Sequence, residues 1–264
     1  MSNAPVLPIS LVIVSDFEPG PKTWHDEDEC LQRSMDDPHG IPAQVVVAAS
    51  AAYQDTPPPD WSHLPVPVKV VFVDSEYSGT IKNGATEHAT QDLLAVVEAD
   101  CISTPGWLNS LYTKYQQDPA VQAVTGLTTY EPTSAMRRVS SLYDRGYLRL
   151  SSPNGDAKHI SNNGALYTRA LLLEYPYEND ASPFVSAHKR QMQIFHTGHR
   201  VALADDAVQY HAHGGWPFIL DLRKNKGLQY QIMKRYLSDT TPNALQKLWW
   251  PIRMLLGGLR DDFI

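Results

Sequence analysis

Short apolar runs separated by polar, helix-forming stretches dominate the first half of this 264-residue chain. Five runs share this character: 9–14, 44–49, 68–73, 93–97 and 121–127. Because their apolar residues are mostly consecutive rather than alternate, we expect strands that are buried on both faces of a parallel sheet. The stretches 24–36 and 82–91 have the composition of connecting helices. The pattern predicts an α/β fold with a mostly parallel, Rossmann-like central sheet flanked by helices.

The helix expected after the fourth run has clear signals at its start. Ser103 or Thr104 is expected to cap it, and Pro105 suits its first turn. Apolar residues at helical spacing then form one face: Trp107, Leu108, Leu111, Tyr112 and Tyr115. The second half of the chain is less regular, and we expect long loops at 128–160 and 174–186.

Charge and cysteine content narrow the class of protein. The net charge is −7 and no basic stripe is present, which argues against nucleic acid as a partner. The two cysteines fit no zinc or redox spacing, so a reducing compartment is the simpler interpretation. Neither a signal peptide nor an apolar run of about 18–20 residues is visible. We therefore expect a cytoplasmic protein.

The segment 245–264 differs from the rest, because tryptophans and large aliphatic residues alternate there with Arg253 and Arg260. Two interpretations stay open. The segment is either a peripheral contact with the inner face of a membrane or a terminal helix docked on the core. We expect one catalytic domain over 1–244, divided at about 127/128, followed by this C-terminal helix.

Glu98-Ala99-Asp100 ends the fourth apolar run with two carboxylates. In α/β sheets ligands bind beyond the carboxyl ends of the strands, where Ser15–Glu18 and the residues after Ala49 also belong. Carboxylate oxygens suit Mn²⁺ or Mg²⁺, and such a cation allows an acidic protein to bind a diphosphate. The alternative is a solvated turn. No P-loop or G-x-G-x-x-G motif offers another phosphate site.

Residues 81–111, IKNGATEHATQDLLAVVEADCISTPGWLNSL, resemble the core of glycosyltransferase family 2. In that family an Asn-x-Gly helix leads to an Asp turn, a hydrophobic strand, an Asp-x-Asp motif and a Pro-Gly-Trp-Leu helix. The matching positions here are Asn83, Asp92, 93–97, Asp100 and Pro105–Leu108. Weaker matches extend the likeness to about residues 6–213, including Gly198–His213, which resembles a Gly-x-Arg strand ending in Tyr-His.

The resemblance implies a GT-A fold and a metal-dependent, inverting transfer of a sugar. The donor would be a UDP- or GDP-linked sugar, and the acceptor a hydroxyl of a saccharide or of a lipid-linked molecule, as in polysaccharide biosynthesis. Asp100 would coordinate the divalent cation. Glu98 would assist it or contact the ribose, and His211 would complete the metal coordination.

Other positions follow from the same resemblance. Glu18 would lie near the nucleoside, Asn83 would support its pocket, and Asn163 would lie near the sugar or the acceptor. At the positions of the family's Asp-Asp-Gly-Ser motif this chain has Ala48-Ala49-Ser50-Ala51. The carboxylate that binds the base or the ribose in the family is therefore missing, and Ser50 would substitute for it only weakly.

The catalytic base is the most serious departure from the family pattern. Counted back from Gly198, the family's Glu-Asp pair falls at Ser186-Ala187. The neighbouring His188 has a suitable ordinary pKa for removing the acceptor proton. Asp180 and Glu178 are the competing candidates.

The arginines at 137, 138, 145 and 149 lie in a helix-like stretch. They either meet an anionic or lipid-diphosphate acceptor or form a solvated helix face.

We expect a glycosyltransferase, and rival functions remain. One is a nucleotide-sugar-binding relative without catalysis. Another is a sugar-phosphate nucleotidyltransferase, which the acidic loop Asp16–Gly20 disfavours. A metal hydrolase built on His211-x-His213 is more distant, because further ligands are not apparent.

Overall fold

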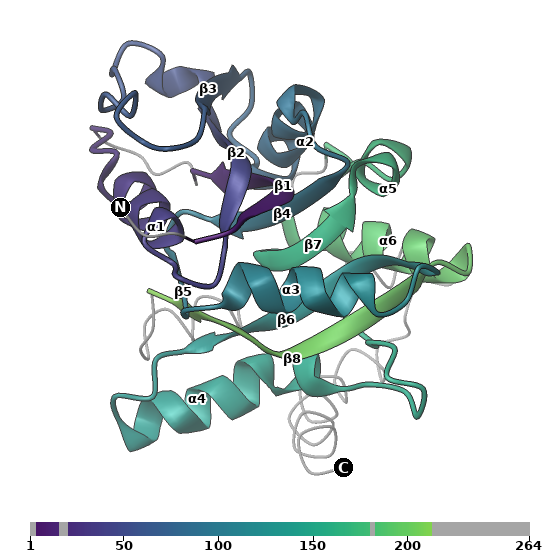
Figure 1. The fold of residues 1–264 in the computed structure, drawn as a ribbon. Helices are drawn as coiled ribbons and strands as arrows, with labels where there is room; N and C mark the ends of the chain where they lie inside the picture. The colour runs from purple at the N-terminus through teal and green to yellow at the C-terminus, as the bar shows by residue number, and fades with distance from the viewer. Residues whose placement is uncertain (1–3, 16–20, 180–182, 213–264) are drawn as a thin grey trace, which may run out of the picture.

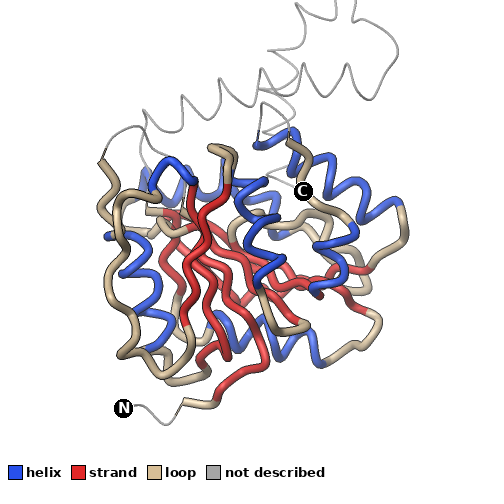
Figure 2. The backbone as a smooth tube through the Cα atoms, turned by 90° about the horizontal axis from the view of Figure 1, so that it is seen from above, coloured by secondary structure: helices blue, strands red, loops and turns tan. Residues whose placement is uncertain are grey.

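The computed structural model describes residues 4–15, 21–179 and 183–212. They form one eight-stranded sheet with strand order β3-β2-β1-β4-β7-β6-β8-β5 and helices on both faces (Figures 1 and 2). The strands are β1 Val6–Val14, β2 Ile41–Ser50, β3 Val68–Val73, β4 Leu93–Glu98, β5 Cys101–Ser103, β6 Val121–Tyr130, β7 Gly164–Thr168 and β8 Arg200–His211. The α-helices are α1 His25–Met35, α2 Ser78–His88, α3 Trp107–Gln116, α4 Ala135–Arg145, α5 Arg169–Glu174 and α6 Pro183–His196. Two 3₁₀ turns complete the list, η1 Ala51–Tyr53 and η2 Gly146–Arg149.

The sheet has a parallel part and a mixed part. The strands β3, β2, β1 and β4 are parallel neighbours. In the remainder β6 and β8 are parallel, whereas β7 runs antiparallel to β4 and β6, and β5 antiparallel to β8. Four of these seven pairings are therefore parallel, and the predicted mostly parallel α/β sheet is confirmed.

Apolar side chains cover both faces of the sheet, which explains the consecutive apolar residues in its strands. In β1 the side chains of Leu11 and Ile13 pack with α1 and α3, whereas those of Val12 and Val14 pack with α2 and α5. The core is thus two apolar layers, one on each side of the sheet, because successive strand side chains point to opposite faces.

The start of α3 differs from the sequence prediction. Neither Ser103 nor Thr104 caps the helix. Its N-cap is Gly106, with a φ of 83° and no side-chain cap bond. The Thr104 hydroxyl instead donates to the Val208 carbonyl, and the Asp37 carboxylate accepts the Gly106 amide at 2.7 Å. A distant carboxylate therefore stabilises the start of this helix. The predicted apolar face of α3 is confirmed, since Trp107, Leu108 and Leu111 are buried.

Two further boundaries were wrong. The helix predicted at 82–91 runs from Ser78 to His88. It ends there because strand side chains bind the following backbone amides: Gln44 accepts from Thr90, and Ser10 accepts from Gln91.

The stretch 128–160 is not one long loop. It contains the end of β6, α4 and η2, and the Ser134 hydroxyl caps α4 by accepting the Arg137 amide at 3.2 Å. The segment 245–264 lies outside the described residues. Within the described part of the chain, no helix combines the length and apolarity needed to cross a bilayer.

Candidate functional site

The carboxyl ends of β1, β2 and β4 meet at one edge of the sheet, because these strands are parallel neighbours. Glu98 ends β4 and is paired with Val14 of β1. The Ser15 amide donates to the Ala48 carbonyl at 2.8 Å, and the Ala99 amide donates to the Val14 carbonyl at 2.9 Å. These bonds fix the backbone where the strands end, and so fix where the acidic turn begins.

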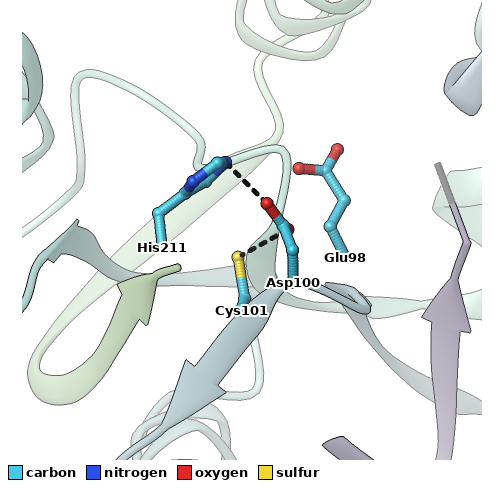
Figure 3. A group of neighbouring side chains, drawn as sticks. All are labelled: Glu98, Asp100, Cys101 and His211. Atoms are coloured by element: carbon cyan, nitrogen blue, oxygen red, sulfur yellow. Dashed lines mark hydrogen bonds and ion pairs between the residues drawn. The ribbon is translucent and has the colours of Figure 1, made fainter. Parts of the chain in front are cut away.

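The turn after Glu98 brings two distant segments together. It leads into β5, whose Cys101 is paired with His211 at the end of β8. The Ala212 amide donates to the Asp100 carbonyl at 2.8 Å. As Figure 3 shows, Glu98, Asp100, Cys101 and His211 form a cluster, and their potential ligand atoms lie within 4.8 Å of one another.

Asp100 and His211 face each other directly in this cluster (Figure 3). Asp100 Oδ2 lies 3.3 Å from His211 Nε2, and the Cys101 thiol donates to Asp100 Oδ1 at 3.7 Å. The Asp100 and His211 side chains are only 12% and 9% exposed. The Tyr130 ring lies edge-on to the imidazole at 6.3 Å. Because water has little access, charge interactions here are stronger than at the surface.

Glu98 has different surroundings from Asp100. Its Oε1 accepts from Lys82 Nζ at 2.8 Å and its Oε2 accepts from Asn163 Nδ2 at 2.8 Å. Burial by itself raises the pKa of the Glu98 carboxyl, but the Lys82 ammonium, His211 and the Asn163 amide together outweigh it, and the pKa lies below its usual value. Glu98 is therefore a carboxylate whose two oxygens are already held.

Cys101 is a neutral member of the cluster. Burial, reinforced by the negative charges of Asp100 and Glu98, raises the pKa of its thiol well above the ordinary value. A protonated thiol is a poor ligand for a hard cation. The donors that fit a hard divalent cation are thus the two carboxylates, with the His211 imidazole as a nitrogen donor.

The segment that contains this acidic turn matches a known family. The model described as glycosyl transferase family 2 matches residues 60–175, from the approach to β3 to the end of α5. Over these residues, which are less than half of the chain, the sequence is similar to glycosyltransferase family 2. A comparison with curated protein sequences finds no match.

Solved structures of two glycosyltransferases share the fold. A mannosyltransferase from Pyrobaculum calidifontis, in complex with GDP-Man and Mn²⁺, has a TM-score of 0.56 at 18% identity, with 88% of this chain and 65% of that chain covered. Glucosyl-3-phosphoglycerate synthase from Mycobacterium tuberculosis, in complex with Mn²⁺, UDP and phosphoglyceric acid, has a TM-score of 0.53 at 15% identity, with 89% and 80% covered. The predicted GT-A fold is confirmed. The chain spans less than two thirds of the mannosyltransferase.

Lys82 is a residue of the candidate site that the sequence interpretation missed. It lies in α2, is 3% exposed, and places its ammonium 5.7 Å from the centre of the Tyr177 ring. Buried lysines are rare unless paired, and here Glu98 is the partner. The available signal was helical spacing, because Lys82 shares a face with the small residues Gly79 and Ala85.

The two asparagines predicted from the family resemblance occupy different places. Asn163 is 4% exposed and belongs to the acidic site, since it donates to Glu98. Asn83 instead joins α2 to the segment before α6: its amide donates to the Tyr177 carbonyl at 2.8 Å and accepts the Tyr177 amide at 2.9 Å. Asn83 therefore holds Tyr177 beside Lys82, and a role in the nucleoside pocket stays a prediction.

Ser50 lies at the carboxyl end of β2, on the predicted edge of the sheet. It is 2% exposed, and its hydroxyl caps η1 by accepting the Ala52 amide at 3.3 Å. Its contact with substrate stays a prediction. Glu18 and His213 lie outside the described residues.

Lys22 is a second missed cation at the same edge. Its ammonium donates to the Ser15 hydroxyl at 2.7 Å and forms an ion pair with Glu27, which is 1% exposed. It also lies 5.0 Å and 5.3 Å from the ring centres of Trp24 and Tyr53. The Lys22 ammonium therefore lies beside the end of β1, with its charge balanced by the Glu27 carboxylate.

Among the residues that the structure describes, no hydrogen bond or ion pair joins the predicted catalytic base to the acidic cluster. His188 lies in α6, and burial lowers the pKa of its imidazole. Two positions along the same helix, the buried Arg190 stacks 4.5 Å from the Tyr177 ring. Residues two apart on a helix point about 200° apart, so His188 faces away from the Tyr177–Lys82–Glu98 network. The role of His188 stays a prediction.

The two acidic competitors for the base are placed differently. Asp180 lies outside the described residues. Glu178 is half exposed at 46% and forms an ion pair with Lys189 at 2.8 Å, while its carbonyl accepts the Ser186 hydroxyl. Glu178 therefore holds the start of α6.

Proposed function

We propose that this chain transfers a sugar from a nucleotide-diphosphate donor to a hydroxyl acceptor, with inversion, as a hexosyltransferase. The observation that carries the proposal is the convergence of Glu98, Asp100 and His211 at the edge where β1 and β4 end. The match of residues 60–175 to the family 2 model supports the reaction class.

A divalent cation, Mn²⁺ or Mg²⁺, fits the donors of the cluster. Asp100 and His211 would hold it directly. Glu98 would bind it through water or by giving up one of its present bonds, because Lys82 and Asn163 already bind both of its oxygens. When bound, such a cation neutralises a diphosphate and stabilises its charge as it leaves.

The protein's own side chains would prepare this site. Lys82 and Asn163 fix the Glu98 carboxylate, and the paired backbones of β5 and β8 set the separation of Asp100 and His211. A preorganised site of this kind needs little rearrangement as charge develops on the leaving group. His188 or Asp180 would accept the proton of the acceptor hydroxyl.

The donor nucleotide is proposed as UDP or GDP, because the similar structures were solved with UDP or with GDP-Man. The acceptor is proposed as a saccharide or a lipid-linked hydroxyl. We further propose one catalytic domain over 1–244 and a peripheral contact of 245–264 with the inner face of the membrane.

A thermal-shift experiment tests the central step. The protein is heated with UDP or GDP, with and without Mn²⁺, in parallel with the Asp100→Asn variant. We expect stabilisation that requires both nucleotide and cation, of about 2.7 kcal/mol at a hundredfold excess over Kd, and its loss in Asp100→Asn. Equal stabilisation of wild type and variant would contradict the proposed metal site.

A non-catalytic nucleotide-sugar-binding relative is the second candidate. One observation favours it: the family's base position is occupied by Ser186 and Ala187, which are buried. Metal-dependent nucleotide binding without hydrolysis or transfer of any nucleotide sugar would support this candidate over the first.

A further inference from the structure

The helix α4 turns its polar side chains toward the sheet and its apolar ones away. Ser140 is 8% exposed, and the Ser141 hydroxyl accepts the Tyr130 amide at 3.1 Å and donates to the Tyr130 carbonyl at 3.2 Å. The exposed apolar side chains are Met136 at 46%, Val139 at 60% and Leu142 at 62%. A helix packed on a sheet normally has the opposite orientation.

These three apolar residues form one continuous stripe. They recur every third position, so they lie within about 120° of one another around the helix axis. In Figure 1 α4 runs along the outer margin of the described part of the molecule, beyond β6 and β8. An exposed apolar stripe on this side indicates a surface that binds a membrane or another protein.

The charge around the stripe is opposite to that of the whole chain. Residues 135–149 contain four arginines against one acid, Asp144, although the net charge of the protein is −7. Arg138 and Arg149 are exposed. Apolar residues flanked by arginine are typical of helices that lie in the interface of an anionic membrane. A second copy of this chain is a poorer partner, because α4 against α4 would place arginines opposite arginines.

The inner face of α4, opposite the stripe, is linked to the candidate site. The backbone of Tyr130, to which Ser141 is bonded, ends β6, and the Tyr130 ring contacts the His211 ring edge-on at 6.3 Å. A surface that contacts the stripe is therefore separated from the His211 side of the site by α4 and the end of β6.

We propose that the outer face of α4 binds an anionic lipid bilayer. Val139, Leu142 and Met136 enter the boundary between headgroups and acyl chains, and Arg138 and Arg149 meet the anionic headgroups. Such a contact would present a lipid-linked acceptor to the site, and this role rests on the proposed function. The binding of α4 to the bilayer does not depend on that function.

Vesicle co-sedimentation with the full chain tests the proposal. The vesicles contain phosphatidylcholine alone or phosphatidylcholine with an equal part of phosphatidylglycerol. We expect binding to the anionic vesicles and a loss of about tenfold or more in Val139→Glu/Leu142→Glu, because charged residues replace buried apolar ones. Arg138→Gln should weaken binding about fivefold. Leu173→Glu is the matched control, since Leu173 is 47% exposed on α5, and it should bind as the wild type.

Three outcomes would overturn the proposal. The first is no binding of the wild type to anionic vesicles. The second is equal binding by the double variant, which places the contact elsewhere, for example in 245–264. The third is a fall in Tm of several degrees in the double variant without lipid, or a change from dimer to monomer, since either result means that protein covers the stripe. The cation-dependent response to nucleotide is measured without lipid, so failure of the proposed function is recognised separately.

Discussion

The parallel and the mixed parts of the sheet contribute to the candidate site in different ways. In the parallel part, β1 and β4 are neighbours whose ends coincide, so regular strand pairing places Glu98 at the site and starts the turn to Asp100 there. In the mixed part, β8 delivers His211 only because β5 turns back and pairs with it. The parallel part therefore supplies the carboxylates through regular strand ends, and the mixed part supplies the imidazole through a long-range pairing.

The side chains that the two carboxylates face differ in the same way. Lys82 ties α2 to β4, and both belong to the parallel part, whereas the partner of Asp100 comes from the far end of β8. Glu98 is therefore held by the parallel part of the sheet, whereas Asp100 faces the imidazole that the mixed part supplies. The predictions on kinetics, stability and pH below test this division of roles, and the last prediction concerns the catalytic base.

The largest effect is expected from Asp100→Asn. Loss of the principal cation ligand should lower kcat by about a thousandfold, because a bound metal supplies several kcal/mol of charge stabilisation. His211→Gln should cost less, about 10- to 100-fold, if the imidazole only completes and orients the site. Steady-state kinetics over a range of Mn²⁺ concentrations would measure both variants.

Asp206→Asn is the matched control for these kinetics. Asp206 is an exposed carboxylate of β8 that accepts the Ser110 hydroxyl, and its loss should leave kcat unchanged. A larger loss in His211→Gln than in Asp100→Asn would reverse the comparison between the two parts of the sheet.

The second prediction concerns stability. Lys82→Met should lower the free energy of unfolding by about 3 kcal/mol, because it leaves the buried Glu98 carboxylate without its cation. Arg33→Met is the control, since the Arg33–Glu29 pair is 47% and 42% exposed and should contribute less than about 0.5 kcal/mol. Urea unfolding of the two variants would measure the difference, and equal losses would show that the buried pair is not part of the scaffold.

This pair also predicts a pH dependence. The pKa of Glu98 is lowered in the folded protein, so its stabilising contribution is present above the unfolded pKa of about 4.3 and is lost as pH falls through the folded pKa. In Lys82→Met, burial is no longer opposed by the ammonium, so the pKa of Glu98 should rise and stability should begin to fall at a higher pH. If stability in Lys82→Met falls at the same acidic pH as in the wild type, Lys82 is not the group that lowers the pKa of Glu98.

The third prediction identifies the base. If His188 is the base, His188→Ala should lower kcat/KM by at least about a hundredfold. Burial lowers the pKa of His188 from its ordinary value of 6.5, so the imidazole is neutral at pH 7. The wild-type kcat/KM should therefore be independent of pH around pH 7 and fall only in more acidic solution. If Asp180 is the base, Asp180→Asn should cause the loss of kcat/KM. The pH at which the wild-type rate falls in acid should then be lower than for a histidine base. His63→Asn is the control, since His63 is an exposed histidine bonded to the nearby Asp60 carbonyl, and it should leave kcat/KM unchanged. If none of these variants changes kcat/KM, neither residue is the base.

Much of the parallel part was predictable from the sequence. Runs such as 9–14 and 93–97 are apolar on consecutive positions, because both faces of their strands are covered, and that property is local. The position of Glu98 and Asp100 at a ligand-binding edge followed from the same reasoning. The family resemblance added His211, which no local pattern connects to the acidic turn.

The mixed part and the caps were less predictable, for a common reason. The Asp37 carboxylate binds the start of α3, and Gln44 and Ser10 bind the residues that end α2, although each is far from its partner in sequence. Hydrogen bonds between distant segments leave no periodic signal, so the helix ends were misplaced. The burial of Lys82 likewise became visible only with Glu98 opposite to it.

The amino-acid sequence by itself determined the alternation of buried strands and helices and the two acids at the end of one strand, because hydrophobic period and residue type act over a few neighbouring positions. Only the tertiary structure decided which nitrogen each acid meets and which way α4 turns its apolar side. Both depend on the pairing of β5 with β8 and on the packing of α4 against the end of β6. These contacts join residues that are distant along the chain, and their energy exists only after the chain has folded.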